Sequence, residues 1–223
     1  MNGTYLVIPA YNEEARLPGV VEELKKFFPL ERVVVVDDGS KVEIKSFLPS
    51  KVRVARHMVN LGKGIALRTG CELAIELGAK KIVLMDGDGQ HDPKEIPYFI
   101  KELDKKYKII FGARKLGKDM PAWRMVGNQL LNKTVATLFG LELHDVWCGY
   151  RAFDTSVYPS IVWNAADYSS DVEMVVNVGL QKLKHKERYV GTIYHNKKST
   201  TGTTLQDGLK LLLELFIWRI FKR

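Results

Sequence analysis

The chain contains only two cysteines, Cys71 and Cys148, and they lie far apart in the sequence. A disulfide framework and the paired cysteines of a zinc site are therefore excluded, and we expect both thiols to be buried in the core. Long apolar runs are also missing. The best candidate, residues 209–221, is shorter than the roughly 20 residues that a spanning helix needs, and three charged residues interrupt it.

Targeting and nucleotide-binding signatures of common kinds are absent as well. A strand-like run begins at Thr4, with no basic segment or cleavage site of a secretory signal before it, so we expect a cytoplasmic protein. No GxGxxG motif follows a strand, and residues 60–64 (NLGKG) lack the full GxxxxGK[ST] pattern. An NAD enzyme and a P-loop ATPase are therefore disfavoured.

The composition is that of a folded protein with a basic surface. Of 223 residues, 46% are hydrophobic and 27% are charged, which suits one α/β domain or at most two small ones. Lys and Arg number 34 against 26 Asp and Glu, a net charge of +8. Such a surplus favours anionic partners, whether nucleic acid, phosphorylated metabolites or an anionic membrane face.

Short apolar, β-branched runs alternate with helical patterns along the chain. We expect strands at 4–9, 32–36, 51–55, 81–85, 108–112 and 188–194, and helices at 13–28, 64–77, 93–105, 123–139, 171–183 and at the C-terminus. A short segment at 145–153 and a polar loop at 195–203 complete the chain. This alternation predicts a single α/β domain, a mostly parallel sheet with helices on both faces.

Polar side chains follow three of the predicted strands where each strand ends. They are Tyr11 and Glu13 after the first, Asp37 and Asp38 after the second, and Asp86 and Asp88 after the fourth. Ligands of parallel sheets bind at the carboxyl ends of the strands. Grouped carboxylates repel one another unless a cation is bound, so the pattern predicts a cation-dependent site at this edge.

The run Asp86-Gly87-Asp88-Gly89-Gln90 is the strongest candidate for a metal site. Two carboxylates at i and i+2 can share one divalent ion, and Mg²⁺ takes one or two carboxylates while keeping positions for water and phosphates. The amide oxygen of Gln90 adds a neutral ligand, and the glycines let phosphates approach the backbone. The alternative is a solvated acidic turn, since Asp-Gly pairs are common in turns.

The remaining candidates are contacts to a nucleotide and to anions. Tyr11 would stack on a base or contact a ribose, and Asp37 would accept a hydrogen bond from either; alternatively, Asn12 only caps the following helix. Lys63 would bind a pyrophosphate or remain solvated. Arg114 and Arg124 would bind a second anionic group, because the planar guanidinium suits phosphate.

These residues stand in segments that resemble family 2 glycosyltransferases with the GT-A fold. The segments are residues 7–14 (VIPAYNEE), 36–40 (VDDGS), 60–64 (NLGKG) and 86–93 (DGDGQHDP). Residues 145–151 (DVWCGYR) are similar to the D-x-x-[SC]-G-[FY]-[RK] segment of that family, and 171–174 (DVEM) continue the match. The resemblance covers nearly the whole chain and implies a GT-A domain at 1–203 followed by an amphipathic helix at 204–223.

Within that family the chain looks most like dolichyl- and polyprenyl-phosphate mannosyl- and glucosyltransferases. The resemblance implies Mg²⁺ or Mn²⁺ at Asp86, Asp88 and Gln90, with Asp88, Arg114 and Arg124 as catalytic residues. Donor contacts are expected from Pro9, Tyr11, Glu13, Val36, Asp37, Asp38, Lys63, Asp86, Gly87 and Lys197. Two departures affect the donor: residues 42–44 (VEI) replace the usual D-G-T, and residues 202–204 (GTT) lack the lysine of a late G-x-S-K segment.

The reaction implied is inverting transfer of a hexose, mannose favoured, from GDP-mannose or UDP-glucose to a lipid monophosphate. Because the second pKa of a phosphate monoester is about 6, the attacking oxygen is mostly ionised near neutral pH. Little general-base help is then needed. Arg114 and Arg124 would position the acceptor phosphate, with Asn128 a weaker candidate.

The C-terminal helix fits a lipid acceptor. Its apolar residues recur at helical spacing from Leu209 to Ile220, with basic residues near the end. This pattern predicts an interfacial helix at the cytoplasmic membrane face. The alternative is a helix packed on its own domain or on a second subunit of a homo-oligomer.

Three other functions share some of these sequence features with a lipid-phosphate glycosyltransferase. A family 2 transferase with a soluble acceptor would share the donor site. A sugar-1-phosphate nucleotidyltransferase would need a Gly-rich, Arg-containing loop after the first strand, which residues 9–14 lack. A nucleic-acid-binding domain fits the charge but neither the acidic strand ends nor the motifs, so we expect no nucleic-acid partner.

Overall fold

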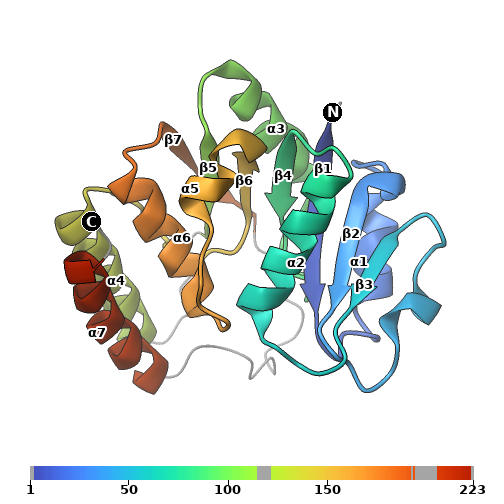
Figure 1. The fold of residues 1–223 in the computed structure, drawn as a ribbon, viewed down its shortest axis with the longest axis horizontal. Coiled ribbons are helices and arrows are strands. Elements are labelled where there is room, and N and C mark those ends of the chain that lie inside the picture. The colour runs from blue at the N-terminus through green and yellow to red at the C-terminus, as the bar shows by residue number, and fades with distance from the viewer. Residues whose placement is uncertain (1–2, 115–121, 192, 194–204, 222–223) are drawn as a thin grey trace.

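A seven-stranded sheet in the order β3-β2-β1-β4-β6-β5-β7 forms the centre of the molecule (Figure 1). The computed structural model describes residues 3–114, 122–191, 193 and 205–221. The strands are β1 Thr4–Ala10, β2 Val33–Asp37, β3 Arg53–Arg56, β4 Lys81–Leu84, β5 Ile109–Arg114, β6 Arg151–Asp154 and β7 His185–Val190. All neighbours pair in parallel except β6, which is antiparallel to both β4 and β5. The predicted α/β class with a mostly parallel sheet is confirmed.

Helices cover both faces of the sheet, and alternate residues of β1 and β2 enter two cores. Val7, Val34 and Val36 face one core, whereas Leu6 and Ile8 face the other. The first core is closed by α2 Lys63–Glu76, α4 Ala122–Phe139, α5 Tyr158–Ile161, α6 Ser169–Leu180 and α7 Leu205–Phe221, and the second by α1 Leu17–Leu24 and α3 Ile96–Lys105. Short 3₁₀ turns lie at η1 Leu30–Arg32, η2 Ile44–Phe47, η3 Pro93–Glu95 and η4 Thr155–Val157.

Two helices begin later than their sequence patterns predict, and a proline explains each case. The helix expected at 13–28 is α1, which starts only at Leu17, and Pro18 occupies its first turn. The helix expected from residue 93 becomes η3 followed by α3, with Pro97 in the first turn of α3. A proline beyond the first turn would remove a hydrogen bond and clash with the carbonyl four residues earlier. Each helix therefore starts just before its proline.

In the second half of the chain, the expected strand at 188–194 is wrong in its bounds. β7 starts three residues earlier and ends at Val190, pairing along β5 from Ile109↔His185 to Arg114↔Val190. Its sequence, HKERYV, is mostly polar and carries no buried apolar alternation. Pairing with β5, a tertiary effect, decides where this strand lies. The helix predicted at 171–183 is α6, shifted two residues towards the N-terminus at its start.

The strand order brings together the three strand ends that are followed by the polar side chains predicted to form the site. β2, β1 and β4 are neighbours, so the residues after Asp37, Ala10 and Leu84 share one edge, the lower edge in Figure 1. β6 runs the other way, and its first residue, Arg151, pairs with Leu84 and Phe111. The segment that precedes β6 therefore reaches the same edge.

The C-terminal helix α7 packs beside α4 at one side of the molecule (Figure 1). Its inner residues Leu211 and Leu215 are fully buried. Within the described part of the chain, no helix is long and apolar enough to cross a membrane. Both cysteines are buried and unpaired, as predicted.

At Gly70, α2 packs so closely on the sheet that there is no room for a side chain. A Cβ at this position would lie 2.4 Å from Val7 Cγ1 and 3.1 Å from Val36 Cγ2. We expect Gly70→Ala to lower the free energy of unfolding by about 1–3 kcal/mol, because overpacking outweighs the gain in helix propensity. Urea unfolding followed by circular dichroism measures this change.

Gly19 in α1 supplies the matched control, since a Cβ there would meet nothing within 4 Å. Gly19→Ala should leave stability unchanged or raise it by up to about 1 kcal/mol. If Gly70→Ala proved as harmless as Gly19→Ala, the close packing of α2 on β1 would be contradicted.

Candidate active site

The turn after β1 is tied to the turn after β2 by Asn12. Its backbone N–H donates to Ser40 Oγ at 2.9 Å, and its Oδ1 accepts from the backbone N–H of Lys41 at 3.0 Å. Asn12 adopts a left-handed φ of 54° and does not cap α1, whose first residue is five positions later. The neighbouring Tyr11 is 46% exposed at this edge, where it is accessible to a ligand.

Asp37 is completely buried, and protein donors occupy its carboxylate. The backbone N–H groups of Ser40 and Ile44 donate to it at 2.9 and 3.3 Å, and Arg56 Nη1 lies 2.6 Å from its Oδ2. A contact to a base or ribose would compete with these donors. The side chain of Val36 is fully buried in the core and is not exposed to a ligand.

Asp38 organises the segment that leads into α2. Its carboxylate accepts from the backbone N–H groups of Leu61 and Gly62 at 3.0 and 2.8 Å and lies 2.7 Å from His57 Nδ1. The residue is 3% exposed. Asp38 thus holds the turn that carries Lys63, and its carboxylate is engaged inside the protein.

The Lys63 ammonium lies between two carboxylates, 2.8 Å from Asp86 Oδ1 and 3.0 Å from Asp171 Oδ2. It also lies 5.6 Å from the centre of the Tyr168 ring. Burial opposes the charge on Lys63, but Asp171 and Asp86 raise its pKa well above the ordinary value. Burial also opposes the charge on Asp86 and by itself would raise its pKa, but Lys63 and His91 lower that pKa to about 2. Both groups are therefore charged at neutral pH.

Arg151 continues this row of alternating charges into the core. Its guanidinium is 1% exposed, donates to the carbonyls of Cys148 and Val146 at 2.8 and 2.9 Å, and lies 3.8 Å from Asp171 Oδ1. Gly149 leaves the space that the Lys63–Asp86 pair needs, since a Cβ there would lie 2.9 Å from Asp86 Oδ2 and from Lys63 Nζ. The segment before β6 is thereby fixed against the Asp86 turn.

Asp88 is half-buried, and its carboxylate accepts from the backbone N–H and the side-chain amide of Gln90 at 2.9 and 2.8 Å. None of the described cationic side chains forms an ion pair with it. Burial raises the pKa of Glu13, Arg16 lowers it, and the charge of Asp88 raises it further. Among the described residues, no ion pair therefore balances the negative charge of Asp88 at the end of β4.

Asp88 and the amide oxygen of Gln90 fit a hard divalent ion such as Mg²⁺ or Mn²⁺. In the described ranges, no three His, Cys, Asp or Glu side chains come together as a metal cage. Mg²⁺ does not need one, because it keeps waters and substrate phosphates as ligands. The third predicted ligand, Asp86, is held by Lys63, so the residues present favour Asp88 and Gln90.

His91 packs against the Asp86–Asp88 turn, and the sequence did not predict a role for it. Its Nδ1 accepts from the backbone N–H of Asp86 at 3.1 Å, and its ring stacks on Tyr150 with centres 4.7 Å apart. Burial lowers the pKa of His91, although Asp86 and Asp88 oppose this. A neutral ring suits the accepting Nδ1. Gly87 allows the same turn to approach the Pro9 carbonyl, which lies 3.1 Å from where a Cβ would be.

Arg114, at the end of β5, is joined to Asp145 by two side-chain contacts. Its Nε lies 2.7 Å from Asp145 Oδ2, and its Nη2 lies 3.0 Å from Oδ1. Burial opposes the charge of Arg114, but Asp145 raises its pKa. Arg114 ends β5 at the same edge of the sheet as the Asp86–Asp88 turn, since β4 and β5 both run antiparallel to β6. Its charge also helps to lower the pKa of Asp86 and of His91.

Three other predicted residues are less well defined. Lys197 and the side chain of Arg124 lie outside the described residues, although the backbone at 124 belongs to α4. Asn128 is 7% exposed on α4, and no described group hydrogen-bonds to its Oδ1. Their proposed roles stay predictions.

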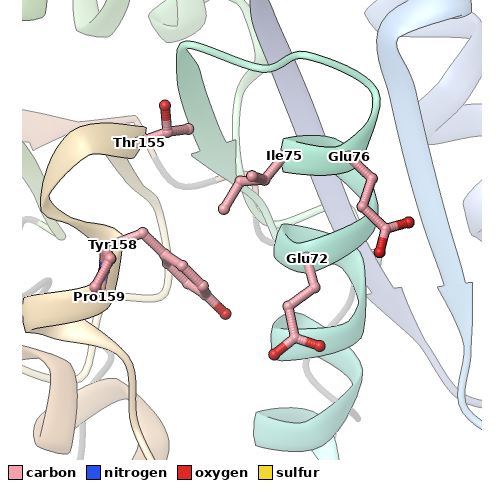
Figure 2. A pocket seen from close by; sticks show the side chains of 6 residues that line it. All are labelled: Glu72, Ile75, Glu76, Thr155, Tyr158 and Pro159. Atoms are coloured by element: carbon pink, nitrogen blue, oxygen red, sulfur yellow. The ribbon is translucent and has the colours of Figure 1, made fainter.

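A surface cavity of about 350 Å³ lies elsewhere, between α2 and the η4–α5 segment. Figure 2 shows its lining side chains, Glu72, Ile75, Glu76, Thr155, Tyr158 and Pro159. Glu76 ends α2, whereas Lys63 begins it, a separation of about 20 Å at 1.5 Å per residue. The cavity contains none of the predicted site residues and is separate from the strand ends.

Comparison with known proteins identifies the family. The curated relatives include the UDP-N-acetylglucosamine--dolichyl-phosphate N-acetylglucosaminyltransferase of Methanococcus voltae, 32% identical over 98% of this chain and 96% of the relative. Polyprenol monophosphomannose synthase of Mycolicibacterium smegmatis is 30% identical over 74% of this chain and 66% of the relative.

Among solved structures, glucosyl-3-phosphoglycerate synthase from Mycobacterium tuberculosis with Mn²⁺, UDP and glucosyl-3-phosphoglycerate superposes with a TM-score of 0.70. The match covers 98% of this chain and 78% of that one at 17% identity, and so establishes the GT-A fold alone. The family model for glycosyl transferase family 2 matches residues 5–162. The chain therefore belongs to glycosyl transferase family 2.

Proposed function

We propose that this family 2 glycosyltransferase moves a hexose from a nucleoside diphosphate sugar to a polyprenyl or dolichyl phosphate, with inversion at the anomeric carbon. The observation that carries the proposal is the carboxylate of Asp88, which no described cation pairs with and which lies at the same edge of the sheet as Lys63 and Arg114. A carboxylate for a divalent ion and an arginine that can donate hydrogen bonds to phosphate therefore occur at the same edge.

The names of the relatives support the acceptor class but differ in the sugar. One relative is named for N-acetylglucosamine and the other for mannose, and both names include a dolichyl phosphate or polyprenol monophosphate group. We keep GDP-mannose as the first donor to test. UDP-glucose and UDP-N-acetylglucosamine follow it.

On the donor side, Tyr11 would stack on or contact the nucleoside, and the backbone around Gly87 would admit the diphosphate. A divalent ion held by Asp88 and Gln90 would neutralise the charge that develops on the departing nucleoside diphosphate. Lys63 keeps Asp86 ionised and fixed, so that Asp86 can accept hydrogen bonds from the sugar or ribose.

On the acceptor side, Arg114 would donate hydrogen bonds to the lipid phosphate and hold one of its oxygens in line with the anomeric carbon. With a second pKa of about 6, this oxygen is already mostly ionised near neutral pH. No side chain then has to remove a proton. This agrees with the pairing of Asp37, Asp86 and Asp145 with Arg56, Lys63 and Arg114, which leaves Asp88 for the divalent ion.

Replacement of Asp88 tests the mechanism. We expect Asp88→Ala to reduce sugar transfer at least about 100-fold, as loss of one electrostatic contact to the transition state does elsewhere. The far-UV circular dichroism spectrum should not change. Transfer is measured with a labelled donor, polyprenyl phosphate and Mn²⁺.

Asp104→Ala is the matched control, because Asp104 is an exposed carboxylate on α3 that pairs with Lys81 away from the site. It should leave transfer at the wild-type level. Wild-type activity of Asp88→Ala at the same metal concentration would disprove the role of Asp88.

The apolar outer face of α7 supports contact with a membrane. Four apolar side chains of this helix are each more than half exposed: Leu213, Phe216, Ile217 and Ile220. On the neighbouring α4, Val126 and Leu130 are also more than half exposed. Grouped exposed apolar side chains of this kind are typical of surfaces that bind a membrane or a protein partner. We propose that residues 204–223 lie on an anionic membrane surface and bring the site to its lipid acceptor.

Polar substitutions on this face test the membrane contact. Leu213→Gln together with Ile217→Gln should weaken binding to anionic vesicles at least about tenfold, because each buried aliphatic side chain contributes roughly 1.5–3 kcal/mol. Co-sedimentation measures this. The substitutions leave the net charge unchanged, and transfer to a short, water-soluble polyprenyl phosphate should persist. Unaltered vesicle binding would refute the contact.

A further inference from the structure

We propose that Asp145 is a positioning residue that sets the direction in which Arg114 presents its hydrogen-bond donors to an acceptor phosphate. The proposal rests on the proposed function for its ligand. It adds a residue whose role neither the motif pattern nor the comparisons assign.

Asp145 holds Arg114 at three points. Its Oδ2 accepts from the Arg114 backbone N–H at 3.1 Å and from Nε at 2.7 Å, and its Oδ1 accepts from Nη2 at 3.0 Å. The Asp145 side chain is fully buried, whereas that of Arg114 is 29% exposed. The buried carboxylate therefore binds the edge of the guanidinium formed by Nε and Nη2.

The remaining donors of Arg114 lie on the opposite edge of its planar group. An arginine side chain carries five N–H donors in a fixed fork, and Nε and Nη2 are engaged by Asp145. No described side chain or carbonyl accepts from Nη1. This edge is therefore available to a phosphate, and its direction is fixed because the fork is rigid.

The same contact removes most of the net charge of Arg114. A cation already paired with a buried carboxylate attracts distant anions weakly, but its hydrogen bonds to a phosphate oxygen stay directional. Arg114 then acts more as an oriented pair of donors than as a source of positive charge. This gives the proposal a signature that a purely electrostatic role would not show.

Asp145 is itself anchored from the edge of the sheet by Glu187 on β7. Glu187 Oε1 accepts from the backbone N–H groups of His144 and Asp145 at 2.8 and 3.2 Å, and its Oε2 lies 2.6 Å from His144 Nδ1. Glu187 pairs in register with Phe111, three residues before Arg114 on β5. Two neighbouring strands thus fix both Arg114 and the carboxylate that orients it.

The test compares Asp145→Asn with wild-type enzyme. The amide keeps the shape of the side chain but turns one of its two acceptors into a donor facing Arg114. We expect kcat for transfer to farnesyl phosphate to fall roughly 10- to 100-fold, as small misplacements of a positioning group do, while the KM of the donor sugar stays unchanged. In ¹⁵N-labelled enzyme, the Arg114 Nε–H signal should lose its protection from solvent exchange.

Asp154→Asn is the matched control, because Asp154 pairs with Lys108 at 3.2 Å at the other end of β6. It should retain wild-type kcat. If Asp145→Asn transferred sugar as fast as this control, or bound farnesyl phosphate more tightly with unchanged kcat, Arg114 would act by charge alone and the proposal would be overturned.

Two further readouts keep the result decisive. If Asp145→Asn unfolds, Arg114→Lys keeps the charge without the fork; it should show the same fall in kcat, and wild-type kcat would overturn the proposal. If the wild-type enzyme transfers no sugar to any polyprenyl phosphate, the proposed function fails. Positioning then stands only if farnesyl phosphate shifts the Arg114 Nε–H signal in wild-type enzyme and not in Asp145→Asn.

Discussion

The Lys63 ammonium, held between Asp86 and Asp171, is the contact on which the candidate site depends. Removing one partner of a buried ion pair typically costs 3–5 kcal/mol, because a charge is left unpaired in the interior. This cation fixes the start of α2, the turn after β4 and the start of α6 to one another. Because Lys63 already pairs with the ionised Asp86, we assign the divalent ion to Asp88 rather than to Asp86.

The sheet topology explains why residues far apart in sequence meet here. β2, β1 and β4 are parallel neighbours, so their carboxyl ends form one edge, and the single reversed strand, β6, starts at that edge. The loop before β6 thereby brings Asp145 to Arg114 and Gly149 to the Lys63–Asp86 pair. A fully parallel strand at this position would deliver its preceding loop to the opposite edge.

The sequence predicted the fold class, most elements and the grouping of acidic strand ends, because periodicity and turn residues act locally. It did not predict which charges pair. The contacts of Asp37 and Asp38 to a nucleotide stay predictions, and the sequence did not indicate that their carboxylates also accept from Arg56, from the turn before α2 and from other backbone groups. The contact of Glu187 with residues 144 and 145 depends on the register in which β7 pairs with β5. No local pattern in the polar sequence of β7 encodes that register.

We propose that the carboxyl edge of the sheet binds a nucleoside diphosphate and a divalent ion together. The melting temperature of the protein with GDP or UDP, each with and without Mn²⁺, tests this claim most directly. Ligand at 100 times its Kd stabilises a protein by about 2.7 kcal/mol, or roughly 5–10 °C for a chain of this size. We predict such a rise for one nucleotide only when Mn²⁺ is present. An unchanged melting temperature with every combination would contradict the account.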